Sequence, residues 1–335
     1  MASFSKFGND LYTGERSYNI VGRRRIWFSI AGVLVLIAIL VPIFKGFNFS
    51  VEFKGGSLFT VSGVGTAPDQ KTATRAVGEV VPGEVPTVVI AAAGTPNTSV
   101  QVTTNLLTAL KTQDVKSSLA KAYNVPESKV ASTFIGASWG QDITQAAIEA
   151  LIAFIVLAII IMALYFRTWK MSLAAIVALL HDLIIVVGVY AILGFEVSPD
   201  AVIGLLTILG YSLYDTVVVF DKIRETTSED GENSSRTFAQ SVNLAVNQTL
   251  VRSINTSVVA LLPVAAILFI GATLLGAGTL RDISLALFVG ILSGTYSTIF
   301  VAAPLYSLLR EREPDNQKRA KKVVARASAT SGAVR

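Results

Sequence analysis

Residues 204 to 224 read GLLTILGYSLYDTVVVFDKIR, a stretch apolar enough to cross a membrane that carries a carboxylate, Asp215, near its middle. Burying an ionised carboxylate in a bilayer costs about 2.5 to 3.5 kcal/mol on insertion scales, so such a group usually faces a polar path and has a partner. We therefore expect Asp215 to gain and lose a proton, although a purely structural buried carboxylate is the alternative.

The composition around this stretch indicates a membrane protein. Hydrophobic residues make up 52% of the chain and charged residues 15%, with a mean hydropathy of +0.59. These values exclude an ordinary soluble domain. Six runs reach the roughly 20 apolar residues that a helix needs to cross a bilayer. They are residues 26–44, 143–166, 171–195, 201–220, 254–275 and 283–309. The sequence predicts an α-helical polytopic membrane protein with six transmembrane helices.

The positive charges predict the orientation, because Lys and Arg of short loops gather on the cytoplasmic side. Basic residues cluster before the first run, between runs two and three, between runs four and five, and after run six. We expect both termini to be cytoplasmic, with a loosely ordered segment 1–25, a cytoplasmic loop 222–251 and a disordered basic tail 310–335 held near anionic lipid. The first run is expected to be a retained anchor. This topology explains the net charge of +5 without nucleic-acid binding.

Residues 45–142 form an extracytoplasmic domain in this topology, followed by the transmembrane region 143–309. Its expected elements are a strand over 49–61, a helix over 69–80, strands over 87–92 and 99–104, a helix over 112–123 and a strand over 129–135. This β-α-β-β-α-β order is that of an α+β ferredoxin-like fold. Gly55 and Gly56 interrupt the first strand, as a bend or as a close approach of another backbone. Its scattered charges favour a binding or lever role over catalysis.

Other polar residues share the predicted spans with Asp215. Thr207 and Tyr211 precede it at i−8 and i−4, and Ser212 at i−3, which gives the fourth span a polar face. In the third span, His181 and Asp182 lie about 17 Å beyond Lys170, near mid-membrane. A structural and a functional role are both open for these two residues.

Arg252, at the start of the fifth span, is the best cationic partner for Asp215. Asn255 and Thr256 follow on the same helical face, and a long arginine side chain can reach into the membrane. The alternative is an interfacial arginine that only snorkels. Before it, residues 237–250 have apolar side chains at helical spacing, which predicts an interfacial amphipathic helix.

The absence of cysteine and the single histidine argue against disulfides and metal clusters. We expect no cofactor other than a proton gradient.

Several motifs in this order resemble the SecD/SecF family of protein-export membrane proteins, which is related to the RND transporters. They are residues 18–28, Phe53 with Gly55 and Gly56, His181-Asp182, residues 210–224 and Arg252. The resemblance implies a non-enzymatic subunit in the bacterial plasma membrane that assists preprotein export with SecD and the SecY/SecE/SecG channel, with YajC and the membrane insertase as further partners. It also implies that Asp215 and Arg252 couple proton flow to movement of the external domain. The acidic insert around 228–235 is longer than usual for the family.

Three other functions fit parts of the pattern. An intramembrane aspartyl protease would use Asp182 and Asp215, but His181 stands where such a site has glycine. An RND-type exporter would use the same relay to drive lipids or small molecules outward. In a purely structural scaffold, neutralising Asp215 would change nothing.

Overall fold

The computed structural model describes residues 2–65, 68–91, 98–166, 168–229, 235–271 and 278–332. Within them, six helical segments are long and apolar enough to cross a membrane, which agrees with the six predicted runs. They are α2 (Arg24–Lys45), α6 (Ala137–Phe166), α7 (Trp169–Leu193), α8 (Pro199–Glu229), α9 (Phe238–Ala266) with the π-helix η2 (Ile267–Gly271), and α11 (Gly278–Ser297) with the π-helix η3 (Thr298–Ala302) and α12 (Ala303–Glu311). The chain is a multi-pass membrane protein.

The bundle has a buried centre and an exposed periphery. The segments α7, α8 and α11–α12 are the most buried, whereas α2, α6 and α9 leave most of their apolar surface uncovered. Small residues bring helices together: a Cβ on Gly188 of α7 would lie 2.3 Å from the Cβ of Ala38 in α2. Such close backbone approach is a usual way for membrane helices to pack. The polar core described below lies among the buried helices.

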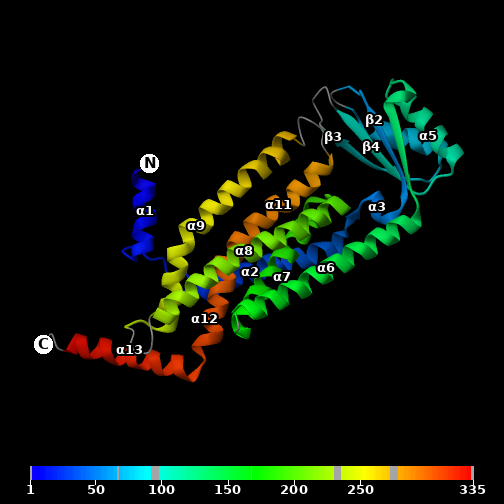
Figure 1. Ribbon diagram of the computed structural model, residues 1–335. Helices are drawn as coiled ribbons and strands as arrows, with labels where there is room; N and C mark the ends of the chain where they lie inside the picture. Colours follow the sequence, from blue (N-terminus) through cyan, green and yellow to red (C-terminus); the bar gives the residue numbers. More distant parts are fainter. Residues whose placement is uncertain are drawn as a thin grey trace.

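An α+β domain stands at one end of the bundle (Figure 1). Its elements are β2 (Gly56–Ser62), α4 (Gln70–Val80), β3 (Thr87–Ala91), β4 (Ser99–Thr104), α5 (Ala109–Ala122), the 3₁₀ turn η1 (Glu127–Lys129) and β5 (Val130–Ile135). The strand order is β3-β4-β2-β5 with antiparallel neighbours. This confirms the ferredoxin-like prediction. Alternate residues of β2 and β4, such as Phe59 and Val102, are fully buried against the helices.

The predicted first strand is wrong in its first half. The chain forms a short β1 (Asn48–Phe49), then a helical turn α3 (Val51–Lys54), and only then β2. Two glycines make this change of direction, with φ of 73° at Gly55 and 149° at Gly56. A Cβ on Gly56 would lie 2.4 Å from the carbonyl oxygen of Thr104. The close-approach interpretation is therefore confirmed, because only glycine lets β2 pass β4 at this point.

The segment 1–25 is ordered where we expected a loose one. It forms helix α1 (Ala2–Thr13) and then a stretch whose backbone is bound by two side-chain amides of α9. Asn243 Oδ1 accepts from the backbone N–H groups of Ile20 (2.9 Å) and Val21 (3.1 Å), and Asn247 Oδ1 accepts from that of Tyr18 (2.7 Å). These bonds satisfy backbone groups that would otherwise need water.

The predicted cytoplasmic loop contains the expected helix in its second part, but the loop and the tail are more helical than predicted. Helix α8 continues to Glu229 and α9 begins at Phe238, so residues 222–229 and 238–251 are helical. Residues 230–234, within the acidic insert, lie outside the described residues. The predicted interfacial helix is the first part of α9, and its apolar residues Phe238, Val242 and Val246 are buried in the protein core rather than at a membrane surface. The tail forms helix α13 (Pro314–Gly332) up to its described end.

Candidate functional site in the core of the helical bundle

Asp182 is the centre of a hydrogen-bond network that joins three buried helices. Its side chain is 2% exposed. The carboxylate accepts hydroxyl hydrogens from Ser212 of α8 (2.6 Å) and from Ser293 (2.7 Å) and Ser297 (2.8 Å) of α11. The Nδ1 atom of His181 lies 3.2 Å from the same carboxylate. The Asp182 side chain is therefore held from several sides at once.

The local sequence explains why these groups meet. Ser293 and Ser297 are four residues apart, so both side chains project from one face of α11. Gly294 is on the side of α11 that faces α8, since a Cβ there would be 3.1 Å from both Cβ and Oγ of Ser212. Because this position has no side chain, the two helices approach closely enough for their serines to share Asp182.

Asp215 is the second buried carboxylate, 7% exposed, and its surroundings differ. It accepts a hydrogen bond from Ser253 Oγ of α9 at 2.6 Å, and the Thr298 hydroxyl and the charge of Arg252 also interact with it. The next residue, Thr216, shares a hydrogen bond of 2.9 Å with Thr298. Since Thr298 follows Ser297, the hydroxyl groups beside the two carboxylates come from consecutive residues of one helical segment. A line of polar side chains thus crosses the apolar core from α7 to α9.

Arg252 does not form the predicted ion pair in this structure. Between the described residues, no salt bridge within 4.0 Å joins it to Asp215, and its side chain is exposed on α9. The residue that reaches the carboxylate is its neighbour Ser253. Successive helical residues point about 100° apart, so a helix turned to direct Ser253 inward directs Arg252 outward. Asn255 is exposed as well. The role of Asp215 and Arg252 as a proton relay stays a prediction.

The predicted polar face of α8 is divided between the core and the surface. Ser212 and Asp215 point into the core, whereas Thr207 is exposed and donates to the backbone of its own helix at Ile203 (2.8 Å). Tyr211 is half-buried and its hydroxyl interacts with Ser257, whereas Nε2 of His181 has no hydrogen-bond partner among the described residues.

The hydroxyl groups of Ser253, Ser293, Ser297, Thr216 and Thr298 were not predicted. The signal for them was the recurrence of Ser and Thr at helical spacing within otherwise apolar runs. As for metals, the described part of the chain contains no group of three His, Cys, Asp or Glu side chains that could hold an ion.

Comparison with known families decides which family this bundle belongs to. The sequence profile described as "Protein export membrane protein SecD/SecF, C-terminal" matches residues 114–312, and the profile described as "SecD/SecF GG Motif" matches residues 41–63. The chain belongs to the SecD/SecF family. The buried carboxylates and their hydroxyl donors all lie within the first match.

Relatives within the SecD/SecF family cover nearly the whole chain. Protein translocase subunit SecF of Streptomyces coelicolor is 43% identical over 326 residues, 97% of this chain and 86% of the relative. The SecF subunit of Mycobacterium tuberculosis strain H37Rv is 40% identical over 336 residues, 98% of this chain and 75% of the relative. These names place the chain among proteins with a role in Sec-dependent export.

A solved SecD/SecF structure has the same fold. The crystal structure of SecDF from Thermus thermophilus, described as a translocon-associated membrane protein, matches with a TM-score of 0.78 and 32% identity. The match covers 89% of this chain but only 39% of that longer chain. SecDF in a form described as super-membrane-facing gives a lower TM-score of 0.61 over 92% of this chain.

The SecD/SecF signature Phe53, Gly55 and Gly56 lies at the junction of domain and bundle. A Cβ on Gly140 of α6 would lie 2.6 Å from the carbonyl oxygen of Phe53, so α3 packs tightly on α6. On the other side, β1 pairs in parallel with the two-residue strand β6 (Glu196–Val197) between α7 and α8. The signature is therefore a structural joint rather than a set of reactive groups.

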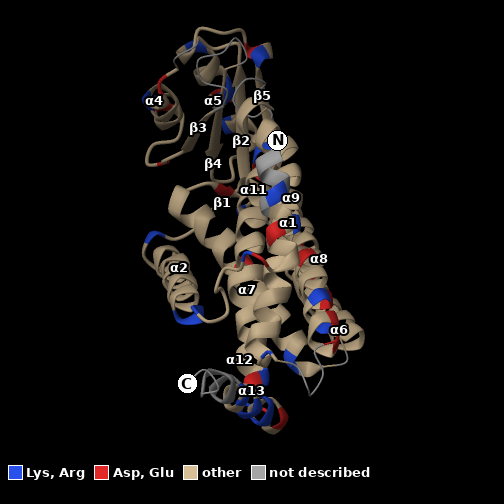
Figure 2. Ribbon diagram, turned by 90° about the vertical axis from the view of Figure 1, so that its left-hand side faces the viewer, with Lys and Arg blue, Asp and Glu red and all other residues tan. Residues whose placement is uncertain are grey.

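Acidic residues lie beside this joint, where Figure 2 shows red ribbon next to β1. Burial raises the pKa of Glu196 above its usual range, and the nearby charges of Asp282 and Glu52 raise it further, while Lys54 lowers it. Asp282, at the start of α11, accepts a hydrogen bond of 2.9 Å from Ser198 Oγ. Helices α3, α8 and α11 thus meet around carboxylates at the end of the bundle that carries the α+β domain.

Proposed function

We propose that this chain is a SecF subunit that works with SecD to drive preprotein export by the proton motive force. In this proposal it assists translocation and release of the preprotein across the bacterial plasma membrane. The single observation that carries it is the buried Asp215, whose carboxylate is reached from α9 by Ser253, the neighbour of Arg252.

The difference between the two carboxylates supports Asp215 as the proton carrier. Asp182 accepts three hydroxyl hydrogen bonds, so protonation would break part of a satisfied network. Among the described residues, Ser253 donates to Asp215 at hydrogen-bond distance, and the Thr298 hydroxyl is a second, weaker partner. A change of its protonation therefore requires less rearrangement of the surrounding core. Both carboxylates already engage separate hydroxyl donors, which disfavours a shared catalytic water of the aspartyl-protease kind.

Arg252 supplies the counter-charge in the proposed cycle. Its side chain leaves α9 about 100° around the helix from that of Ser253, so Arg252 would reach the carboxylate through a rotation of α9 combined with a change in the conformation of its own long side chain. The ionised carboxylate then pairs with the guanidinium, and the protonated one bonds to the hydroxyl. Each proton that crosses contributes about 2.3 kcal/mol per 100 mV of membrane potential, in addition to the pH difference.

Movement of the bundle would reach the α+β domain through the joint at α3, α6 and β1. We place this domain outside the cytoplasm and both termini inside it, following the distribution of basic residues. There, together with SecD, it would hold emerging preprotein against backsliding near the SecY/SecE/SecG channel, YajC and the insertase. The uncovered apolar faces of α2, α6 and α9 are available for SecD and lipid, and the basic tail for anionic lipid.

The test replaces Asp215 with Asn in the full chain, reconstituted with SecD and the channel in vesicles. We expect proton-gradient-dependent release of preprotein to fall at least tenfold, while ATP-driven entry into the channel continues. Glu225→Gln is the matched control, because this carboxylate lies on the exposed end of the same helix. Full release by a correctly folded Asp215→Asn variant would refute the proposal. Gradient-driven efflux of a lipid or small molecule would favour the exporter instead.

A further inference from the structure

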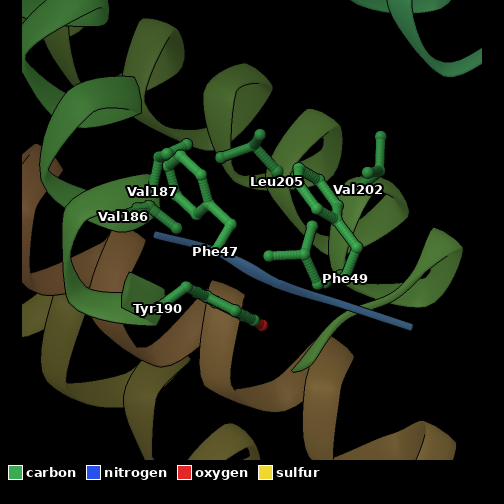
Figure 3. Close-up of a pocket in the computed structure, with 9 residues that line it drawn as sticks. Phe47, Phe49, Val186, Val187, Tyr190, Val202 and Leu205 are labelled. Atoms are coloured by element: carbon green, nitrogen blue, oxygen red, sulfur yellow. The ribbon is translucent and has the colours of Figure 1, made fainter. Parts of the chain in front are cut away.

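An apolar pocket of about 220 Å³ lies between the linker after α2 and the helices α7 and α8. Its lining is formed by Phe47, Phe49, Val186, Val187, Tyr190, Val197, Ala201, Val202 and Leu205. Figure 3 shows the rings of Phe47 and Phe49 projecting from the linker toward Val187, Leu205 and Val202. The hydroxyl of Tyr190 is engaged elsewhere, since it donates to the backbone oxygen of Asp282 at 2.6 Å. The wall therefore presents apolar surface alone.

The pocket lies in the half of the membrane next to the α+β domain. Helix α7 starts at Trp169 at the opposite membrane surface, and Val186 and Tyr190 lie in its last two turns. At 1.5 Å per residue they are about 26 and 32 Å from that start, near the far edge of a hydrocarbon layer of about 30 Å. The first two turns of α8 supply Ala201 and Leu205. This is the level of the upper acyl chains of that leaflet.

The size and apolar lining of the pocket favour the binding of a hydrocarbon chain segment. Sites for whole small molecules usually measure about 300 to 1,000 Å³ and contain a few polar groups that orient the ligand. This pocket is smaller and offers none, so it fits part of a chain rather than a complete polar ligand. An apolar cavity also excludes water. An acyl chain can enter from the surrounding bilayer without losing any hydrogen bond.

A cation stands at the headgroup side of the pocket. Lys45 ends α2 two residues before Phe47, and its ammonium donates to the backbone oxygen of Ile192 at 2.7 Å, two residues after Tyr190. An ammonium group has three donors, so two remain for a further acceptor. The side chain is exposed at the membrane surface. Its charge is complementary to the phosphate of a lipid whose chain descends into the pocket.

We propose that this pocket binds one acyl chain of a phospholipid from the leaflet next to the α+β domain, with the lipid phosphate at Lys45. Phe47 precedes β1 and Phe49 is its second residue, paired with Val197 of β6, so the bound chain supports the linker that connects α2 to the domain. The site is separate from Asp215 and does not depend on proton coupling. Loss of the lipid would loosen the linker and leave the carboxylate network intact.

Native mass spectrometry of the full chain in detergent, with palmitoyl-oleoyl phosphatidylglycerol added, tests the site. We expect one phospholipid to stay bound per wild-type chain. Val187→Phe and Val202→Phe each fill the pocket from a half-buried position and should lower lipid retention at least tenfold. Val259→Phe is the matched control on the outer face of α9, where the side chain is 67% exposed. Lys45→Gln should weaken retention at least threefold.

Two controls separate the possible occupants. Diacylglycerol with the same chains should bind at least threefold more weakly than the phospholipid, and equal binding would overturn the role of Lys45. A benzophenone amino acid at position 49, activated in membranes, should form adducts with lipid. Adducts with protein alone would overturn the proposal and assign the pocket to a partner segment. Equal lipid retention by folded Val187→Phe, Val202→Phe and Val259→Phe would overturn it as well.

Discussion

Replacing Asp182 with Ala should destabilise the bundle more than replacing Asp215 with Ala. The reason is the number of hydroxyl groups, among the described residues, that lose their acceptor: three donate to Asp182, whereas Ser253 donates to Asp215 with Thr298 as a weaker second partner. A hydrogen bond to a charged group contributes about 1.5 to 3 kcal/mol, so the three bonds set an upper limit of about 4.5 to 9 kcal/mol.

Two effects reduce this limit at Asp182. Ser297 Oγ also lies 3.2 Å from the backbone oxygen of Gly294 and keeps that partner, and the other serines can turn to carbonyl groups of their own helices. Removing a buried carboxylate also removes its desolvation penalty. We therefore expect a loss of about 2 to 4 kcal/mol for Asp182→Ala and about 1 kcal/mol for Asp215→Ala. Asp182→Asn keeps one acceptor oxygen and should fall between the wild type and Asp182→Ala.

The measurement is reversible unfolding of the full chain in mixed micelles, with helicity followed by circular dichroism. Asp142→Ala is the surface control, since this exposed residue lies near the start of α6 and should change stability by less than about 0.5 kcal/mol. If Asp182→Ala unfolds at the same denaturant concentration as Asp142→Ala, the network does not hold the three helices together. That result would also contradict the proposal that Asp182 is a fixed structural carboxylate and Asp215 one that changes its protonation.

Three further predictions concern other parts of the molecule. Gly56→Ala should lower the stability of the α+β domain by about 2 kcal/mol or more in thermal unfolding, because its Cβ would meet the carbonyl oxygen of Thr104 at 2.4 Å. Gly65→Ala is the control and should be neutral, because the space around Gly65 is open. Equal effects of the two variants would contradict the prediction. Burial raises the pKa of Glu196 in the folded protein, so its contribution to stability is full below about pH 4.3 and is lost as pH rises through the higher folded pKa. Glu196→Gln should flatten that part of the dependence of stability on pH. An unchanged pH profile of stability would exclude this effect. Asn243→Ala should speed hydrogen exchange at residues 17–22 without changing that of the α+β domain, whereas unchanged exchange would show that this amide does not hold the segment.

The sequence predicts those parts of the fold that depend on period and length. The six apolar runs and the β-α-β-β-α-β order follow from hydrophobic spacing, and the structure agrees with both. The errors lie where long-range packing decides. Residues Phe238 and Val242 have the spacing of an interfacial helix, but the same apolar face packs against Ile20 and Val21 in the core. The spacing of apolar residues on a helix does not determine whether lipid or protein covers them.

The residues of the candidate site also fall into those that the sequence predicts and those that depend on packing. Buried carboxylates stand out in an apolar run, so Asp182 and Asp215 were found from sequence alone. Their partners were not, because a serine in a membrane helix is common and its orientation depends on how the helix is rotated. Arg252 shows the limit most clearly. Charge and position select it, yet the rotation of α9 places the adjacent Ser253 at the carboxylate.

The segment that begins with α11 is the element that connects the proposed proton site with the α+β domain. At its start, Asp282 bonds to Ser198 beside the joint; in its middle, Ser293 and Ser297 hold Asp182; and at its end, Thr298 contacts Thr216 beside Asp215. The π-helix η3 begins at that same threonine. π-Helical turns frequently occur at functional sites in helices. Because Thr298 bonds to Thr216 and also interacts with Asp215, a change in the protonation of Asp215 would act at the point where the helix departs from regular α geometry. A shift of α11 would then reach the acidic joint about 24 Å away along its axis, at 1.5 Å per residue.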